Sequence, residues 1–293
     1  MTSIKNFFSR PTPSTPSVEE RLNEVRRLLQ EADHVLIGAG AGLSAAAGLE
    51  YSGKEFEQEF RPWIERYGIT DLYSSSFYPF ETEEERWAYW AKHIWFARYR
   101  PAATPLYQTL LSIVKDKDYF VATTNVDGQF EKAGFDPDRL FAVQGDYAYL
   151  QPRSGEPKVL YHNQEWVEKA LPAIVDCRIP SDLVPHMPET GELMSSNLRC
   201  DNTFVEDEHW HQQADRYQQF IDDARGDRLL LLEFGIGFNT PAIIRFPFER
   251  MAAQFPRTTL VRFNRDYPQL MTQGITRFLA FTEELPQLLP QIM

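Results

Sequence analysis

The chain has 293 residues, which suits one large α/β domain with an insertion or two domains of ordinary size. Its 30 Lys and Arg residues against 42 Asp and Glu residues give a net charge of −12, and this argues against a basic nucleic-acid-binding surface. Two cysteines exclude a disulfide framework and a four-cysteine zinc site. No apolar run is long enough to cross a bilayer and no signal-peptide core is visible, so we expect a cytoplasmic protein without a membrane partner.

The first segment, residues 1–17, is rich in Pro, Ser and Thr, and we predict an N-terminal arm. Ser17 and Glu20 have the spacing of a capping box, so a helix should begin at residue 18 with its apolar residues on one face. Residues 34–37 (HVLI) follow as a short buried strand. This strand runs directly into a glycine-rich stretch, residues 38–44.

Three later segments repeat the pattern of an apolar strand followed by a loop rich in Gly or Asn. These strands are expected at residues 119–123, 229–234 and 259–263. Helical stretches separate them, so we predict an α/β fold, a Rossmann-like parallel sheet with helices on both faces. Ligands of such sheets bind beyond the carboxyl ends of the strands, where all four loops would lie.

Two stretches, residues 51–100 and 146–210, do not follow this alternation, and we predict that they form a smaller inserted module. Large side chains recur at helical spacing in the first stretch, which favours a buried core over a ligand platform. The members of this stripe are Trp87, Trp90, Ile94, Trp95 and Arg98.

This division leaves an arm, one domain and a tail. The domain would cover residues 18–285, and residues 286–293 would be a C-terminal tail. The sheet-forming core would come from three segments, residues 18–50, 101–145 and 211–285.

Residues 38–48 (GAGAGLSAAAG) carry the strongest local signal. Glycines after a strand let the backbone approach a diphosphate closely, and the start of the next helix offers N–H groups to an anion. The spacing departs from G-x-G-x-x-G, because Leu43 stands in the place of the third glycine. The segment alone leaves two interpretations open, nucleotide binding and a tight strand-to-helix turn.

Five loops together resemble the sirtuin family of NAD-dependent deacylases and ADP-ribosyltransferases. The glycine-rich stretch is followed, in sirtuin order, by residues 123–128 (TTNVDG), Gln-Gly at 144–145, the loop 235–240 and Asn264. The resemblance covers about residues 20–285. It implies that NAD binds across the carboxyl edge of the sheet.

Departures from the common sirtuin pattern narrow the resemblance. Residues 48–53 (GLEYSG) lack the Arg of the family motif, and Gln144 replaces the His of deacylases. Residues 187–191 (MPETG) stand where the zinc module would carry Cys-Pro-x-Cys-Gly. These features resemble class M sirtuins, the macrodomain-linked microbial branch. That resemblance implies protein ADP-ribosylation, a smaller module without the zinc site, and a role in the oxidative stress response.

The resemblance also implies which residues contact NAD. Asn125 and Asp127 would hold the nicotinamide carboxamide and the nearby ribose, and Asp127 could stabilise developing positive charge. Ser44 would reach a phosphate, while Asn264 and Arg265 would lie at the adenosine. Simpler roles remain open, with Asn125 and Asp127 capping the next helix and Ser44 at a helix start. The implied cofactor-binding set is Gly38, Ala39, Gly40, Ser44, Thr124, Asn125, Asp127, Gly235, Ile236, Gly237, Phe238, Asn239, Asn264 and Arg265.

Gln144 distinguishes between the reactions that sirtuins catalyse. In a deacylase the His is a general base on a ribose hydroxyl, and a glutamine amide has no useful proton affinity. Loss of a general base typically costs about 10²–10⁴-fold in rate, which disfavours deacylation. Cleavage of the nicotinamide bond needs only positioning and charge stabilisation. We therefore predict Asn125, Asp127 and Gln144 as catalytic residues, with a structural loop amide as the alternative for Gln144.

A metal site near residue 200 is a separate possibility. Cys200, His209 and His211 lie close in sequence, with Cys177 upstream and several acidic residues in 201–208. His-x-His is a spacing that metal ligands use, but the set matches no compact zinc motif. We predict no bound zinc and two small buried cysteines.

The leading functional prediction is mono-ADP-ribosylation of a protein, with release of nicotinamide. An NAD glycohydrolase and a non-catalytic NAD or ADP-ribose sensor are alternatives, and deacylation fits least. The class M resemblance implies a lipoylated, glycine-cleavage-H-like carrier protein as acceptor and a macrodomain hydrolase as functional partner. An acidic carrier requires a local basic face, and we predict one from four residues: Lys92, His93, Arg98 and Arg100.

Overall fold

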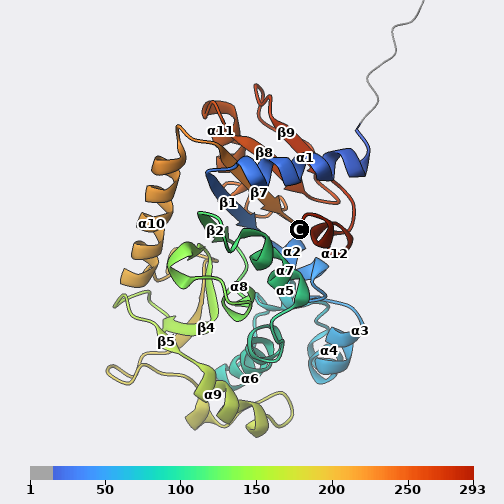
Figure 1. The fold of residues 1–293 in the computed structure, drawn as a ribbon. Coiled ribbons are helices and arrows are strands. Elements are labelled where there is room, and N and C mark those ends of the chain that lie inside the picture. Colours follow the sequence, from blue (N-terminus) through green and yellow to red (C-terminus); the bar gives the residue numbers. More distant parts are fainter. Residues whose placement is uncertain (1–15) are drawn as a thin grey trace, which may run out of the picture.

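A six-stranded, fully parallel sheet forms the centre of the computed structural model, which describes residues 16–293 (Figure 1). The strand order is β3-β2-β1-β7-β8-β9. The inner strands are buried along their length, as expected where helices cover both faces of a parallel sheet. The strands are β1 (His34–Ala39), β2 (Tyr119–Thr123), β3 (Leu140–Ala142), β7 (Leu229–Phe234), β8 (Thr259–Phe263) and β9 (Phe278–Phe281).

Helices pack on both faces of this sheet. One face packs against α1, α2, α7 and α12, and the other against α10 and α11, so the predicted Rossmann-like α/β fold is confirmed. In the part of the chain that the structure describes, no helix combines the length and apolar character that a membrane crossing requires. The helices are α1 (Val18–Glu31), α2 (Ala41–Ala46), α7 (Pro105–Val114), α8 (Gln129–Lys132), α10 (Glu208–Ala224), α11 (Arg245–Gln254) and α12 (Leu285–Leu288).

The start of α1 confirms the predicted capping box. The Ser17 hydroxyl accepts from the Glu20 amide at 3.2 Å, and the Glu20 carboxylate accepts from the Ser17 amide at 2.7 Å. Residues 1–15 of the predicted arm lie outside the described residues.

The prediction of a C-terminal tail at 286–293 is wrong. The segment forms α12 and a 3₁₀ turn, Leu289–Gln291, and its apolar residues are buried against α7 and α2. The two prolines of this segment, Pro286 and Pro290, stand in first turns, where no backbone N–H is needed. The apolar residues recur at helical spacing: Leu285, Leu288, Leu289 and Ile292.

Residues 51–100 and 146–210 fold together beside the sheet domain, in the lower half of Figure 1. A three-stranded antiparallel sheet, β5-β4-β6, packs with short helices around an aromatic cluster. Its strands are β4 (Gly145–Pro152), β5 (Tyr161–His162) and β6 (Met194–Leu198). Its helices are α3 (Lys54–Glu59), α4 (Arg61–Tyr67), α5 (Leu72–Ser75), α6 (Glu83–Ile94) and α9 (Gln164–Ala170).

The predicted aromatic stripe lies on α6 and is core, as expected. Trp87 and Ile94 are fully buried and Trp90 nearly so. The helix then widens into a π-helix, Trp95–Tyr99, which no sequence pattern had indicated. This turn carries Arg98, whose side chain is buried and charged.

The strand order places a topological switch between β1 and β7. From β1 the chain continues to β2 and β3 on one side of the sheet, and returns later to build β7, β8 and β9 on the other. The loops at the carboxyl ends of β1 and β7 therefore diverge and leave a crevice, which is where open α/β sheets bind ligands.

Candidate active site

The loops that follow β1 and β7 touch each other at the carboxyl edge of the sheet. The amide of Gly40 donates to the Phe234 carbonyl at 3.0 Å, and that of Gly42 to the Gly235 carbonyl at 3.1 Å. A Cβ at Gly42 would lie 2.7 Å from the Cα of Gly235, so glycine is required for this approach. The glycine-rich segment thus packs backbone against backbone in addition to bordering the crevice.

The last residues of β1 are closed off from solvent. Ala39 is fully buried, and a Cβ at Gly38 would meet the Ile244 side chain at 2.5 Å. The amide of Thr124 donates to the Ala39 carbonyl at 3.0 Å, which ties the loop after β2 to the end of β1.

Asn125 lies at the centre of a buried polar network. Its amide nitrogen is 3.1 Å from the Gly40 carbonyl, 3.2 Å from the Ser44 hydroxyl and 3.1 Å from the Tyr107 hydroxyl. Tyr107 projects from α7, and sequence reasoning missed it because its spacing is that of an ordinary core residue. The network fixes Asn125 between the loops after β1 and β2.

Asp127 accepts two hydrogen bonds in a nearly closed environment. The Ser44 hydroxyl donates to one carboxylate oxygen at 2.5 Å, and the Gln129 amide donates to the other at 3.0 Å. Burial raises the pKa of Asp127, although both hydrogen bonds oppose the shift. The bond from Gln129 satisfies the first amide of α8, but the N-cap position of this helix is Gly128, one residue after Asp127.

Ser44 joins the same buried network. Its side chain is fully buried and bonded to Asp127, Asn125 and Tyr107. The carboxylate and the phenol thus already satisfy the hydroxyl group, and the phosphate contact that the resemblance implies stays a prediction.

A small cavity of about 20 Å³ opens next to Asp127. It lies between the 49–55 segment, where this chain departs from the common sirtuin motif, and the π-helix. Burial, with the Asp127 charge as the second cause, raises the pKa of Tyr51 well above its usual value, so the phenol stays protonated. The lining residues are Leu49, Glu50, Tyr51, Glu55, Leu72, Phe96, Ala97, Arg100, Pro101 and Asp127.

Gln144 is half-buried in the turn between β3 and β4. Its carbonyl accepts from the Arg199 amide at 3.1 Å. Gly145 follows with φ +89°, and a Cβ there would lie 2.1 Å from the Asn197 carbonyl oxygen, so the turn demands glycine. The Gln-Gly pair is therefore held in one conformation by its neighbours.

The residues predicted at the adenosine end form one loop cluster. The Asn264 amide donates to the Ile236 carbonyl at 2.7 Å, and its oxygen accepts from the Tyr267 amide at 2.9 Å. Arg265 points to solvent and pairs with Asp266 at 3.1 Å. Asn264 thus organises the cluster, while Arg265 makes no contact to the loop after β7 in this structure.

The outer part of the loop after β7 is open. Phe238 and Asn239 are exposed, and Gly237 has free space around its Cα among the described residues. The Phe238 ring packs edge-on against Tyr267 with centroids 5.0 Å apart. An aromatic face is therefore available at this end of the crevice.

Four buried charges lie beneath the adenosine-end loops, and no sequence pattern indicated them. Arg262 pairs with Glu233 at 2.7 Å and with Glu249 at 2.8 Å, and all three side chains are fully buried. Arg245 completes the group and donates to the Tyr267 and Gln269 carbonyls. The charges are thus paired with one another, and Arg245 ties them to the 267–269 backbone.

The predicted basic docking face does not exist. Lys92 pairs with Glu59, and Arg100 pairs with Glu55 at 2.7 Å. His93 is fully buried, and burial lowers its pKa to about 3, so it is neutral at physiological pH. Acidic residues of α3 thus neutralise Lys92 and Arg100, and burial removes His93 from the surface.

The cysteine and histidine cluster is likewise dispersed. Among residues 16–293 no group of three or more His, Cys, Asp or Glu side chains is arranged to hold a metal ion. Cys177 is buried as predicted, but Cys200 is exposed. Zinc content stays a prediction for metal analysis.

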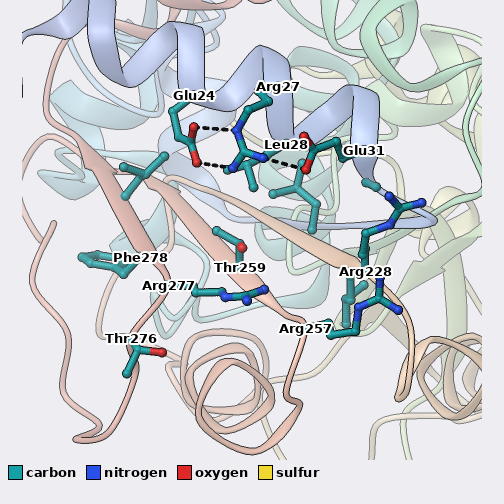
Figure 2. A pocket seen from close by; sticks show the side chains of 14 residues that line it. Glu24, Arg27, Leu28, Glu31, Arg228, Arg257, Thr259, Thr276, Arg277 and Phe278 are labelled. Atoms are coloured by element: carbon teal, nitrogen blue, oxygen red, sulfur yellow. Dashed lines mark hydrogen bonds and ion pairs between the residues drawn. The ribbon is translucent and has the colours of Figure 1, made fainter.

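A cavity of about 470 Å³ lies far from these loops, at the amino ends of β7, β8 and β9 (Figure 2). Figure 2 shows Arg228, Arg257 and Arg277 around it, beneath α1. None of the predicted site residues lines it, so cavity size alone would have located the wrong edge of the sheet.

Comparisons with known proteins place the chain among sirtuin-like enzymes, although no protein-family model matches it. A protein ADP-ribosyltransferase of Staphylococcus aureus (strain Mu50 / ATCC 700699) is 31% identical over 266 residues, which cover 90% of this chain and 84% of that protein. A probable bifunctional ADP-ribose hydrolase/ADP-ribosyltransferase of Fusarium oxysporum f. sp. cubense is also 31% identical over 266 residues. That match covers 86% of this chain and 43% of the relative.

Solved structures agree on the fold. A Sir2 enzyme aligns with TM-score 0.57 at 14% identity, over 94% of this chain and 96% of that chain. A Sir2 complex with a p53 peptide and NAD+ aligns with TM-score 0.56 at 14% identity, over 93% and 97%. The parallel sheet, the loops at its carboxyl edge and the staphylococcal relative lead to one conclusion. The chain belongs to the sirtuin-family protein ADP-ribosyltransferases.

Proposed function

We propose that this enzyme transfers a single ADP-ribose unit from NAD to a lipoylated, glycine-cleavage-H-like carrier protein. NAD is the co-substrate of the family to which the chain belongs. The observation that carries the proposal is the site around Gln144, where an amide without proton affinity stands in place of a general base. Such a site suits cleavage of the nicotinamide bond and transfer of the ribosyl carbon.

We infer a role in this reaction for each of the three predicted catalytic residues. The Asp127 carboxylate, held by Ser44 and Gln129, would stabilise positive charge as the bond to nicotinamide breaks. Asn125, fixed by the Tyr107 hydroxyl, would orient the nicotinamide carboxamide. Gln144 would hydrogen-bond a ribose hydroxyl or the incoming nucleophile.

The acceptor and the partner follow from the class M resemblance. The Fusarium relative supports a functional link, since its name joins an ADP-ribose hydrolase with an ADP-ribosyltransferase. We infer that a macrodomain hydrolase removes the modification from the carrier, and that the pair serves the oxidative stress response in the cytoplasm.

Labelled NAD tests the proposal directly. The protein is incubated with NAD labelled in the adenylate part, with the carrier either lipoylated or not. Label on the lipoylated carrier supports the proposal. Free ADP-ribose alone would identify an NAD glycohydrolase, no turnover would identify a sensor, and loss of an acyl group from a peptide would identify a deacylase.

Asn125→Ala is expected to abolish transfer, because the carboxamide loses its orienting group. Asn202→Ala, at an exposed position, is the matched control. Tyr107→Phe removes one hydrogen bond of the network without touching NAD, and it measures how much of the loss is structural. Undiminished transfer by a folded Asn125→Ala protein would eliminate the sirtuin-type mechanism.

Gln144→Ala is expected to weaken transfer about tenfold, the cost of a hydrogen bond. The pH profile should keep its shape, since no titrating base is lost. Gln144→His is the comparison variant, because an imidazole titrates near neutrality and would add a new inflection to the profile.

A further inference from the structure

We propose that Arg98 is a positioning residue that clamps the loop after β2, with Asn125 and Asp127, to the start of β4 beside Gln144. The inference rests on the proposed function, since it concerns how that site keeps its geometry. It also replaces the docking role that the sequence suggested for this arginine.

The π-helix brings Arg98 to this place. An α-helix and a π-helix differ in residues per turn, so the π turn re-aims the side chains that follow α6, and such turns often accompany functional sites. The Arg98 side chain is only 10% exposed, although it is charged. Burial opposes its charge, but Asp146 and Glu131 outweigh burial and raise the pKa of Arg98.

The guanidinium joins two segments that each adjoin the site. Its Nε and Nη2 donate to the two carboxylate oxygens of Asp146 at 2.8 and 3.2 Å, and Nη2 also donates to Glu131 at 2.6 Å. Asp146 lies two residues after Gln144, and Glu131 lies on α8, which follows Asp127. The planar guanidinium of an arginine can make these hydrogen bonds at the same time, whereas the ammonium group of a lysine does not match their geometry.

The arginine also packs directly on the backbone next to Asp127. A Cβ at Gly128 would lie 2.1 Å from the Arg98 Cζ, so only glycine leaves room for the guanidinium. Gly128 adopts φ +67° as well, which glycine tolerates without strain. The glycine at position 128 therefore suits both the backbone conformation there and the Arg98 guanidinium that packs against it.

Three further hydrogen bonds complete the clamp. The Tyr147 amide donates to the Val126 carbonyl at 3.0 Å, joining the same two segments through the backbone. The Lys132 ammonium donates to the Arg98 carbonyl and, at 2.8 Å, to the Pro101 carbonyl, so α8 holds the end of the π-helix. Without the Arg98 ion pairs, the Tyr147–Val126 backbone hydrogen bond would be the one contact of this group that still joins the two segments.

The test uses Arg98→Lys, with Arg153→Lys as the matched control. Arg153 also makes a two-point ion pair, to Glu83 at 2.9 and 2.6 Å, in the same smaller module and away from the catalytic loops. We expect Arg98→Lys to lower kcat about 10²-fold while KM for NAD changes less than about threefold, because other loops hold the rest of the cofactor. Arg153→Lys should leave kcat within about twofold of the wild type.

Hydrogen–deuterium exchange without NAD gives the second readout. Residues 124–128 and 144–147 should exchange faster in Arg98→Lys and unchanged in Arg153→Lys. If Arg98→Lys does not fold, Glu131→Gln removes the outer contact alone and should cause a smaller fall in kcat and faster exchange in residues 124–128.

Unchanged exchange with unchanged kcat would overturn the proposal, as would an equal loss in both lysine variants. A wild-type protein that releases no nicotinamide would defeat the proposed function instead, and the exchange measurement would then decide the clamp alone.

Discussion

The buried carboxylate of Asp127 affects the stability of the fold and the proposed reaction in opposite directions. Its carboxylate is almost fully buried beside the buried hydroxyls of Ser44 and Tyr107, and burial raises its pKa. A carboxyl group with a raised pKa stabilises the folded chain most at low pH, and this contribution is lost as pH rises from the unfolded pKa through the folded one. The charge that the proposed mechanism places opposite a forming cation is therefore kept at a cost to folding.

Asp127→Asn should thus uncouple the two properties. The amide keeps the acceptor for the Gln129 amide and removes the buried charge, so the melting temperature at pH 7 should equal or exceed that of the wild type. Nicotinamide release should fall about 10²–10³-fold, as when one electrostatic stabiliser is removed. Thermal unfolding from pH 4 to pH 8 measures the first effect, and the stability difference should shrink toward low pH.

The control variant, Asp201→Asn, should change the melting temperature at neutral pH in the opposite direction. Hydrogen bonds from Thr203 lower the pKa of the exposed Asp201, so Asp201→Asn should lower the melting temperature at neutral pH and not at low pH. A large drop in melting temperature for Asp127→Asn at pH 7 would show that the carboxylate is structurally required.

The site residues predicted from the sequence were those with a local chemical signature. Asn125 and Asp127 stand in a short motif after a strand, and the structure places them together around Ser44, while their roles stay predictions. Arg98 and Tyr107 were not assigned to the site, because helical spacing made both look like ordinary core positions. The bonding partners of Ser44 could not be predicted, because they come from α7 and the loop after β2.

At the scale of elements, contact between the loops after β1 and β7 sets the width of the crevice. Gly42→Ala would force the Gly235 backbone away, and overpacking of this kind typically costs about 1–3 kcal/mol. We expect a lower melting temperature and a raised KM for NAD. Gly226→Ala is the control, because a Cβ there meets no atom of residues 16–293 within 4 Å. Identical behaviour of the two variants would mean that the loops do not need this contact.

The C-terminal helix is a second element with a measurable contribution. Leu288 is buried in the main core, so Leu288→Ala should lower the free energy of unfolding by about 2–5 kcal/mol. Gln287→Ala, one position earlier and exposed, should change it little. Denaturant unfolding compares them, and a Leu288→Ala loss under about 1 kcal/mol would mean that residues 285–292 pack loosely.

Elements with clear periodicity were predictable, and the others were not. The four strands expected from the sequence are all in the sheet, since each is a short, mostly apolar run ending in a loop signal. β3 and β9 were missed because they are short. The antiparallel β4, β5 and β6 depend on pairing across distant segments, which weak local patterning does not reveal.

At the scale of the whole molecule, the carboxyl edge of the sheet is surrounded by cations that are paired with acidic side chains. The acidic chain pairs most of the cations near the crevice, including Lys92, Arg98 and Arg100. The sequence showed the net charge but not its pairing, because ion pairs join segments far apart. That is why the predicted basic face failed.

The strand order also has a consequence for folding of this protein during its synthesis. β1 ends at Ala39 and pairs with β2 and then with β7, which begins only at Leu229. While the intervening residues are being synthesised, one edge of β1 remains open, with unpaired N–H and C=O groups on an apolar strand. We expect nascent chains at this stage to depend on chaperones, and fragments released before residue 229 to aggregate. Emergence of β7 closes this edge of β1, and the outer edge of β7 in turn stays open until β8 pairs with it.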